Sequence, residues 1–449
     1  MAIQATLLFN EAKAIQESGS KPVFFRYEAT LHANGKDIPV QYVNYIDTYR
    51  NYLKSRFDVK TISVMLGEGT YQTLVAPFKA NVEMTIRKLP CNEQGVRVNT
   101  ELPVYTMRYR ATPLKGNSGA IEANSMLSDN PVAQDKLNLS TVEFQLIDPV
   151  VERMRLFTFG GTFRKTKMED IIKTVLGVIS QNASKDKALG VNGVEVAETV
   201  TDVVRNHVMI NHSTPFMNLL DWIHEHCGGI FNAGLGWYYQ NNFWHVFPPY
   251  DTKRFTKAKR TLTVVNLQAD RYPNPERSYR LNTGSVILLS TSKVVHEDKT
   301  EEALLNTGNG VRFADASAMM SSAVNVEDNK AVFNKAQNAS EFIFDKRETG
   351  LNMVMESSAK ITSNKNFEFS KLAAKNGGLL QCTWENANID ILTPGMPVKV
   401  LYLEKDTPRE LFGVLIGVDA QTAPVTAGMG DRQFRTNAAL TFFVERKRD

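Results

Sequence analysis

The sequence predicts a mainly β protein with an α+β part: two antiparallel barrel-like β units, a small inserted α/β unit and long loops. Three observations support this prediction. Apolar and polar residues alternate at both ends of the chain, which is typical of half-buried strands. Two central segments carry apolar residues at helical spacing. The chain of 449 residues is also too long for one ordinary hydrophobic core, so we expect more than one unit.

The composition is that of a folded globular protein, with 43% hydrophobic and 22% charged residues. The net charge of +4, from 52 basic and 48 acidic residues, does not favour specific nucleic-acid binding, which usually requires a concentrated basic face. No run approaches the roughly 18 apolar residues of a transmembrane helix. The first residues also lack the basic segment of a signal peptide. We therefore expect a protein that is made in the cytosol and has no membrane segment.

The first third of the chain predicts an arm followed by strands. Residues 1–20 can form a short helix and are predicted to be an N-terminal arm. Residues 21–155 are predicted to be the first β-barrel. Within them, Asn34-Gly35 lies between two alternating runs and is a strong hairpin signal. Residues 71–90 are predicted to contain a half-buried strand, because their apolar residues face one way and their polar residues the other.

Residues 156–250 predict a small α+β unit. Thr166 and Glu169 form a capping box ahead of apolar residues at helical spacing, which predicts a helix that begins there. A second helix is predicted after Thr214, which can cap it, and Pro215, which suits the first helical position. An aromatic hairpin follows.

Strand signals return in the last two segments. Residues 251–375 are predicted to be β-rich, with a long tract at 298–340 that is a surface loop with one short helix near Phe333 or is partly disordered. Residues 376–449 contain a turn and three apolar runs. They are predicted to form a β-meander that completes a second barrel.

The sequence contains no residue set that indicates catalysis, a cofactor or a metal. It has neither a phosphate-binding glycine loop nor a nucleophile elbow. Cys91, Cys227 and Cys382 lie far apart and are odd in number, so free buried thiols are expected. His224 and His226 lie two apart on a predicted helix and would point about 200° away from each other, which does not suit a metal pair. We expect surface histidines, with Cys227 closing the core stripe.

The aromatic hairpin at residues 237–247 has three interpretations. It can form the core of the small unit, a protein interface or a ligand platform. Because tryptophan and tyrosine dominate interface hot spots, Trp237, Tyr239 and Trp244 are candidate interface residues.

The last strand predicts a second candidate. Leu440, Phe442 and Val444 alternate with polar positions and are expected to pack inside the second barrel. Thr441 lies on the opposite face of the strand, which would line a channel or contact a neighbouring protein chain. It is therefore also a candidate interface residue.

Three groups of segments, taken together, resemble the baseplate or tail hub proteins of contractile-tailed bacteriophages, which are related in fold to the base of type VI secretion spikes. They are a strand-proline-strand motif around Pro77, the inserted unit with its double-glycine break and hairpin, and the closing strands. The corresponding residues are 74–87; 156–161 with the capped helix that follows, 213–229 and 244–249; and 392–400, 413–418 and Glu445-Arg446.

This resemblance implies a mechanical role without enzymatic activity or cofactor. The family forms homotrimers in which two tube-forming barrels per chain adapt the six-fold tail tube to the three-fold cell-puncturing spike. It implies a virion protein of the tail baseplate, assembled in the host cytoplasm. The implied partners are the tail tube protein, the spike protein and the baseplate wedge proteins.

Two alternatives stay open at this point. The first is a cell-wall carbohydrate-active tail-associated enzyme that uses the aromatic hairpin as a sugar platform and a carboxylate pair as acid and base. The second is another tail-tube or secretion-tube structural component that shares the barrels but not the hub position.

Overall fold

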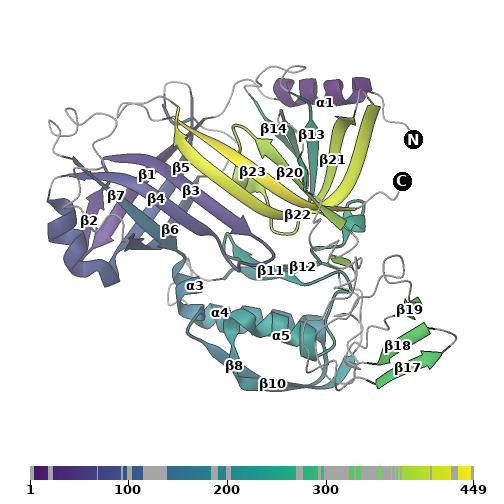
Figure 1. Cartoon of the computed structure of the whole chain (residues 1–449). Coiled ribbons are helices and arrows are strands. Elements are labelled where there is room, and N and C mark those ends of the chain that lie inside the picture. Colours follow the sequence, from purple (N-terminus) through teal and green to yellow (C-terminus); the bar gives the residue numbers. More distant parts are fainter. Residues whose placement is uncertain are drawn as a thin grey trace.

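The computed structural model shows a chain dominated by strands, as the sequence predicts (Figure 1). None of the helices it describes is long and apolar enough to cross a membrane. The described residues are 5–18, 24–67, 69–92, 95–98, 104–114, 139–183, 191–198, 204–268, 277–291, 295–297, 323–327, 330–334, 352–354, 366, 370, 373–374, 377–404, 407–425 and 433–445.

Eight strands form a closed circuit of hydrogen-bonded neighbours. Their order is β22-β3-β4-β7-β6-β5-β1-β23, and β23 pairs back onto β22. The strands are β1 (Phe24–Ala33), β3 (Tyr42–Asn51), β4 (Val59–Gly67), β5 (Glu83–Cys91), β6 (Tyr105–Pro113), β7 (Leu139–Ile147), β22 (Thr407–Pro424) and β23 (Phe434–Glu445). The first six come from the N-terminal third of the chain, and the last two are the C-terminal strands.

Two local predictions for this region have different outcomes. The hairpin signal is confirmed: β2 (Lys36–Pro39) folds back on β1, and Asn34 and Gly35 both have positive φ, as a tight hairpin turn requires. The strand expected before Pro77 is wrong. That segment forms a π-helical turn, η1 (Tyr71–Val75), and a 3-10 helix, η2 (Ala76–Asn81), so that only β5 remains extended.

The second half of the sheet extends from the same two long strands. Its order is β14-β15-β13-β21-β22 on one side and β23-β20-β16 on the other. The strands are β13 (Thr261–Asn266), β14 (Tyr279–Asn282), β15 (Ser285–Ser290), β16 (Val295–Glu297), β20 (Gly377–Trp384) and β21 (Pro397–Glu404). The C-terminal meander is confirmed, because β21, β22 and β23 pair in order and antiparallel. This second half of the sheet is mixed and not wholly antiparallel as predicted, because β13 runs parallel to both β15 and β21.

A β-bulge in β22 lets this strand serve both halves. Before the bulge, Leu411 and Leu415 point into the core, whereas after it Val418 and Ala420 do. Along β22 the inward side chains therefore belong to odd-numbered residues before the bulge and to even-numbered residues after it, and the change lies between Leu415 and Gly417. Because side chains alternate with a period of two, an unbulged strand would turn Asp419 into the core.

The N-terminal segment forms α1 (Ala5–Glu17), which lies across the second half of the sheet (Figure 1). Leu8, Ala12 and Ile15 are fully buried against apolar residues of β13, β15 and β21 and their neighbours. Glu11 also pairs with Arg280 on β14 at 2.7 Å. The sequence predicted the helix but did not reveal this partner face.

The α/β unit lies below the junction of the two halves (Figure 1). Its helices are α3 (Pro149–Met154), α4 (Met168–Ala183) and α5 (Leu219–His226), followed along the chain by the 3-10 helix η7 (Thr252–Arg254). A ribbon of β8 (Thr158–Lys167) and β10 (Val204–Pro215) covers one side. A three-stranded sheet of β9 (Gly193–Val196), β11 (Gly236–Gln240) and β12 (Phe243–Phe247) covers the other.

Both helices are present, but neither predicted cap forms. Thr166 ends strand β8, where its hydroxyl donates to the carbonyl of Arg164, so α4 begins only at Met168. Thr214 and Pro215 end strand β10, and the 3-10 helix η6 (Phe216–Asn218) leads into α5. Thr166 and Thr214 take part in the pairing of β8 with β10 instead of capping a helix, so each helix begins later than predicted.

The tract at 298–340 lies mostly outside the described residues. Within it, β17 (Ala323–Glu327) and β18 (Lys330–Asn334) pair as a hairpin, and β19 (Asn352–Val354) joins them. The short helix expected near Phe333 is therefore wrong, because this residue belongs to β18.

Substitution on the two faces of β23 should have opposite effects on folding. Phe442 is fully buried in the main core, whereas Thr441 is only half-buried on the other face. We expect Phe442→Asp to lower the free energy of unfolding by more than about 4 kcal/mol, because it removes a large apolar side chain and buries a charge. Thr441→Asp should cost about 1 kcal/mol or less. Urea unfolding followed by circular dichroism measures both, and equal losses would show that the faces are assigned wrongly.

Candidate functional site

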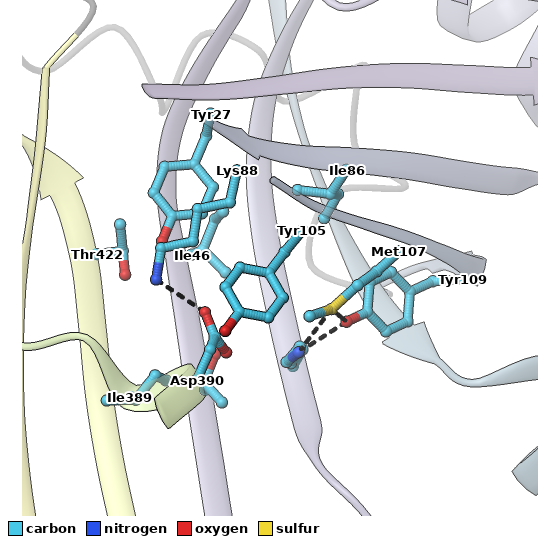
Figure 2. Close-up of a pocket in the computed structure, with 12 residues that line it drawn as sticks. Tyr27, Ile46, Ile86, Lys88, Tyr105, Met107, Tyr109, Ile389, Asp390 and Thr422 are labelled. Atoms are coloured by element: carbon cyan, nitrogen blue, oxygen red, sulfur yellow. Dashed lines mark hydrogen bonds and ion pairs between the residues drawn. The ribbon is translucent and has the colours of Figure 1, made fainter. Parts of the chain in front are cut away.

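The most unusual chemical feature is a cluster of five charged residues between the two halves of the sheet, in which Arg50, Lys60 and Lys88 are buried and two carboxylates are mostly buried. Arg50 comes from β3, Asp58 from the residue just before β4, Lys60 from β4 and Lys88 from β5. Asp390 comes from the 3-10 helix η8 (Ile389–Ile391), which precedes β21 in the second half. Figure 2 shows Lys88 and Asp390 pointing toward each other between strands.

Each member of the cluster has short contacts to an opposite charge. Lys88 Nζ donates to Asp390 Oδ2 at 2.8 Å, and Lys60 Nζ lies 3.2 Å from Asp58 Oδ2. Arg50 joins the two carboxylates, because its Nη2 lies 3.1 Å from Asp58 Oδ2 and 3.4 Å from Asp390 Oδ1. The contacts therefore form one connected chain of five charges.

Neutral partners satisfy most of the remaining donors, although the buried Nε of Arg50 has no hydrogen-bond partner among the described residues. Lys60 Nζ donates to the hydroxyl of Tyr109 at 2.7 Å, and Lys88 Nζ to the side chain of Asn388 at 2.7 Å. Arg50 Nη1 donates to the carbonyl of Ile389 at 2.8 Å. Buried charges of this kind are tolerated only with such hydrogen bonds, since each loses its hydration on burial.

The electrostatics of the cluster keep its members charged. Burial alone would raise the pKa of the Asp390 carboxyl, but the adjacent Lys88, Arg50 and Lys60 outweigh this effect and hold its pKa well below the usual range. Burial would likewise lower the pKa of Lys88, whereas Asp390 and nearby tyrosines raise it above its usual value. These directions describe permanent ion pairs, not groups that exchange protons near neutral pH.

Two small cavities adjoin the cluster and share Lys60, Met107 and Tyr109. The first encloses about 50 Å³ and is lined by polar and aromatic groups, among them Tyr105 and Thr422 (Figure 2). The second encloses about 110 Å³. Substrate pockets usually measure about 300 to 1,000 Å³. Each of these two cavities therefore has room for a few water molecules but not for a sugar.

The second cavity contains a carboxyl group of a different character. Asp148 caps α3 by accepting from the amide of Val150 at 2.8 Å. Burial raises its pKa to about 6, and the amides it accepts from and Lys60 only partly oppose this. Asn241 and Asn242, at the tip of the β11–β12 hairpin, also line this cavity.

The predicted aromatic residues lie inside the α/β unit. Trp237 and Trp244 are fully buried and Tyr239 is 3% exposed, with the centroids of the two tryptophan rings 5.2 Å apart. The hairpin nevertheless forms a contact within the chain, because the Tyr239 amide donates to the carbonyl of Arg56 in the first half at 2.8 Å. The Arg56 guanidinium also lies 4.9 Å from the Trp237 ring centroid.

The other residues singled out from the sequence are spread over the structure. Thr441 pairs with Gln381 and lies on the face opposite Phe442, as expected. The expectation of surface histidines is wrong for His224, which is buried and contacts Ser370 at 3.2 Å; burial lowers its pKa to about 4. Cys227 is half-buried, and burial raises its pKa to about 11.

Among the described residues, no three His, Cys, Asp or Glu side chains are placed to hold a metal ion.

Sequence reasoning missed the charged cluster, although a signal for it was present. Lys88 follows Met84 and Ile86 at a spacing of two, so it occupies an inward position of β5. Arg50 continues the inward row of Ile46 and Thr48 in the same way. A charged residue in an apolar row indicates a buried partner, but the partner Asp390 lies about 300 residues away along the chain and has no local signal.

Removal of the Asp390 carboxylate should destabilise the protein strongly. We expect Asp390→Ala to lower the free energy of unfolding by about 3 to 5 kcal/mol, because Lys88 and Arg50 would remain buried without this partner. The control is Glu83→Ala, which removes a partly exposed ion pair with Arg108 and should cost about 1 kcal/mol or less. Similar small losses in both variants, measured by urea unfolding at pH 7, would contradict a structural role of the cluster.

Asp148 should make stability depend on pH in the acidic range. Its folded-state pKa is raised from 3.8 to about 6, so its stabilising contribution is complete below pH 3.8 and is lost as pH rises through 6. We expect Asp148→Asn, which mimics the protonated form and can still cap α3, to gain roughly 3 kcal/mol relative to the parent between about pH 4 and pH 7. Unfolding curves at several pH values test this, with the exposed Asp170→Asn as the control. Parallel pH profiles of parent and Asp148→Asn would contradict it.

Comparison with known proteins gives structural neighbours only. No family model and no curated protein matches the sequence. The chain is similar to the 43 kDa tail protein of prophage MuSo2 from Shewanella oneidensis, with 9% identity and a TM-score of 0.42 over 92% of this chain and 98% of that one. It is similar to a tail protein from Neisseria meningitidis MC58, with 10% identity and a TM-score of 0.43 over 93% and 96% of the two chains.

A third similar structure is the Francisella PdpA–VgrG complex in its half-lidded form. Identity is 7% and the TM-score 0.37, over 98% of this chain and 62% of that one.

Proposed function

We propose that this chain is a structural virion protein, the central hub of a phage tail baseplate that joins the tail tube to the cell-puncturing spike. In this role it forms a homotrimer and is assembled in the host cytoplasm. The observation that carries the proposal is the way two strands, β22 and β23, belong to both halves of the sheet.

The shared strands suit a protein that transmits force. The first part of β22 pairs with β21 of the second half, and its last part pairs with β3 of the first half. Strand β23 joins the two halves in the same way. It pairs with β20 of the second half and, at Phe434, with β1 of the first half. Relative movement of the halves would break backbone hydrogen bonds along both strands, so the halves form one stiff body.

The buried charges support the same proposal. They tie three strands of the closed circuit to η8 in the second half through side chains that are almost wholly removed from water. Salt screens such pairs much less than exposed ones. The junction should therefore keep its geometry over a wide range of ionic conditions, as a mechanical adapter requires.

One face of the shared strands offers a surface for a channel or a neighbouring chain. Thr441 on β23 lies on this outer face opposite Gly417 on β22. Asp419 lies two residues further along β22, and Asp47 on β3 pairs with Gln421 beyond it. The pKa of Asp47 is raised, first by partial burial and then by the nearby Asp419 and Glu143, against a hydrogen bond from Gln421. Around these residues the outer face is polar and carries two carboxylates, although a small buried apolar cluster of Val414, Ile416 and Phe443 adjoins it.

The proposed trimer uses two β units per chain to present six similar units. The proposed divisions are an arm at 1–20, a first tube-forming barrel at 21–155, an inserted α+β domain at 156–250, a β-rich domain at 251–375 and closing strands of the second barrel at 376–449. The tail tube protein, the spike protein and the wedge proteins are the proposed partners.

The alternatives receive less support. A cell-wall carbohydrate-active enzyme with the aromatic hairpin as platform would need exposed ring faces, but Trp237 and Trp244 are fully buried. Another tail-tube or secretion-tube component would share the sheet and differ only in its partners. The experiment below separates that alternative from the hub.

The solution mass tests the proposal. Light scattering should give three times the 50.3 kDa mass of one chain for the chain alone, or a complex that contains three copies of the chain after mixing with the proposed spike protein. Thr441→Asp should weaken this association, because it adds a charge to a face that already carries Asp419 and Asp47, while the exposed Lys36→Gln should leave it unchanged. A monomer under both conditions would contradict the hub, and binding to a tube protein but not to the spike would favour the other tube component.

A further inference from the structure

We infer that the ribbon of β8 and β10 is a docking surface for an acidic peptide segment of another protein. The ribbon forms the outer side of the α/β unit, away from the junction of the two halves (Figure 1). The inference goes beyond the proposed function, and it can be tested on the isolated chain whether or not that chain is a hub.

The ribbon carries charge of one sign only. β8 contains Arg164, Lys165 and Lys167, and β10 contains Arg205 together with two histidines, whereas neither strand contains an aspartate or a glutamate. Arg164 and Lys165 are exposed, and neither side chain has an ion-pair partner among the residues that the structure describes. The net charge of the whole chain is only +4, so this ribbon is a local concentration of positive charge.

Both strands of the ribbon have an unpaired edge. In the described part of the chain, β8 pairs only with β10 and β10 only with β8. Most residues of β10 are exposed, including Asn206 and Asn211. An open edge can accept an extended peptide as a further strand through main-chain hydrogen bonds.

Exposed apolar side chains lie along the same surface. Met209 on β10 is 68% exposed, and Leu156, in the turn before β8, is 83% exposed; the neighbouring Phe157 is 40% exposed. These apolar groups lie on the ribbon or in the turn that leads into it, next to an open strand edge, and so support an interaction site there. They favour a partner that brings apolar side chains as well as negative charge.

The ribbon is held in place before any partner binds. Val208 and Ile210 point inward and are buried against the apolar residues of α4 and α5. The amide of Phe216 donates to the carbonyl of Phe157 at 2.9 Å, which fixes the end of the surface. A preformed surface reduces the ordering cost of binding.

This combination favours an acidic peptide over the other acidic macromolecules. Nucleic-acid surfaces are usually broad and basic, with phosphate contacts made by many lysines and arginines. Binding at a membrane surface requires a larger continuous apolar face. A short basic ribbon with a few apolar groups and an open edge matches the alternating acidic and apolar residues of an extended peptide.

Binding of a defined probe tests the inference. The probe is a fluorescein-labelled synthetic peptide of roughly eight residues, a common strand length, that alternates glutamate and valine. Fluorescence anisotropy should detect saturable binding to the full chain that weakens as salt rises from about 0.1 M to about 1 M. The double variant Arg164→Glu with Lys165→Glu should lower the affinity by about tenfold or more.

Three controls make the result specific. The double variant Arg435→Glu with Lys36→Glu reverses the same amount of charge at exposed positions of β23 and β2 and should bind like the parent. Met209→Ser should weaken binding while leaving the salt dependence in place. A version of the probe with N-methylated alternate residues should bind more weakly, because it cannot pair fully with the edge.

Several outcomes would overturn the inference. They are absence of saturable binding, equal loss of affinity in both double variants, and a methylated probe that binds as well as the parent probe. Tighter binding of a DNA duplex, or of vesicles with anionic lipid, that is abolished by the Arg164 and Lys165 reversal would assign the ribbon to that class of partner instead. Circular dichroism of each variant shows that a loss of binding is not a loss of fold.

Discussion

The structure depends on a requirement for complete charge pairing where its two halves meet. Lys88 and Arg50 are inward-facing residues of the first half; Lys88 pairs with the carboxylate of Asp390 from the second half, and Arg50 divides its charge between Asp390 and Asp58. Burial of such groups without partners costs far more than a loose apolar contact would. The cluster therefore acts against alternative arrangements of the halves: a rotation or a slipped register would leave a charge unpaired. An apolar junction of equal area would stabilise the fold but would discriminate less between registers.

The bulge in β22 allows this strand to keep apolar side chains in the core on both sides of the junction. One strand has to present apolar residues to a common core while it changes partners from β21 to β3. The extra residue between Leu415 and Gly417 changes the phase of the side chains at the point where the partners change. Asp419 and Gln421 are thereby directed to the polar outer face of the first half, whereas before the bulge the same side of β22 carries the buried apolar residues Val414 and Ile416. The long strand and its irregularity belong together, because a perfectly regular strand of this length could not serve both halves.

Local patterns were sufficient for much of the fold and insufficient for its junction. The sequence predicted the hairpin at Asn34-Gly35, the C-terminal meander and the inward position of Phe442, because each depends on neighbours in the chain. It misplaced the starts of α4 and α5, since Thr166 and Thr214 can serve either a helix cap or a strand and pairing with a distant strand decided between them. The parallel pairing of β13 and the choice of Asp390 as partner for Lys88 arise only from tertiary contacts. The buried positions of Trp237 and Trp244 agree with the core interpretation of the hairpin, one of three that composition left open.

The closure of the first circuit by the last strands also has a consequence for synthesis. Six of its eight strands are complete when residue 147 has been made, but β22 and β23 follow only after residue 406. Until then β3 and β1 have no partner on their outer edges within this circuit, and Lys88 and Arg50 lack Asp390. Contacts of such long sequence separation form slowly, and exposed strand edges promote aggregation in the meantime. The circuit of the first half therefore cannot close until the last two strands have been made, although six of its strands are available much earlier.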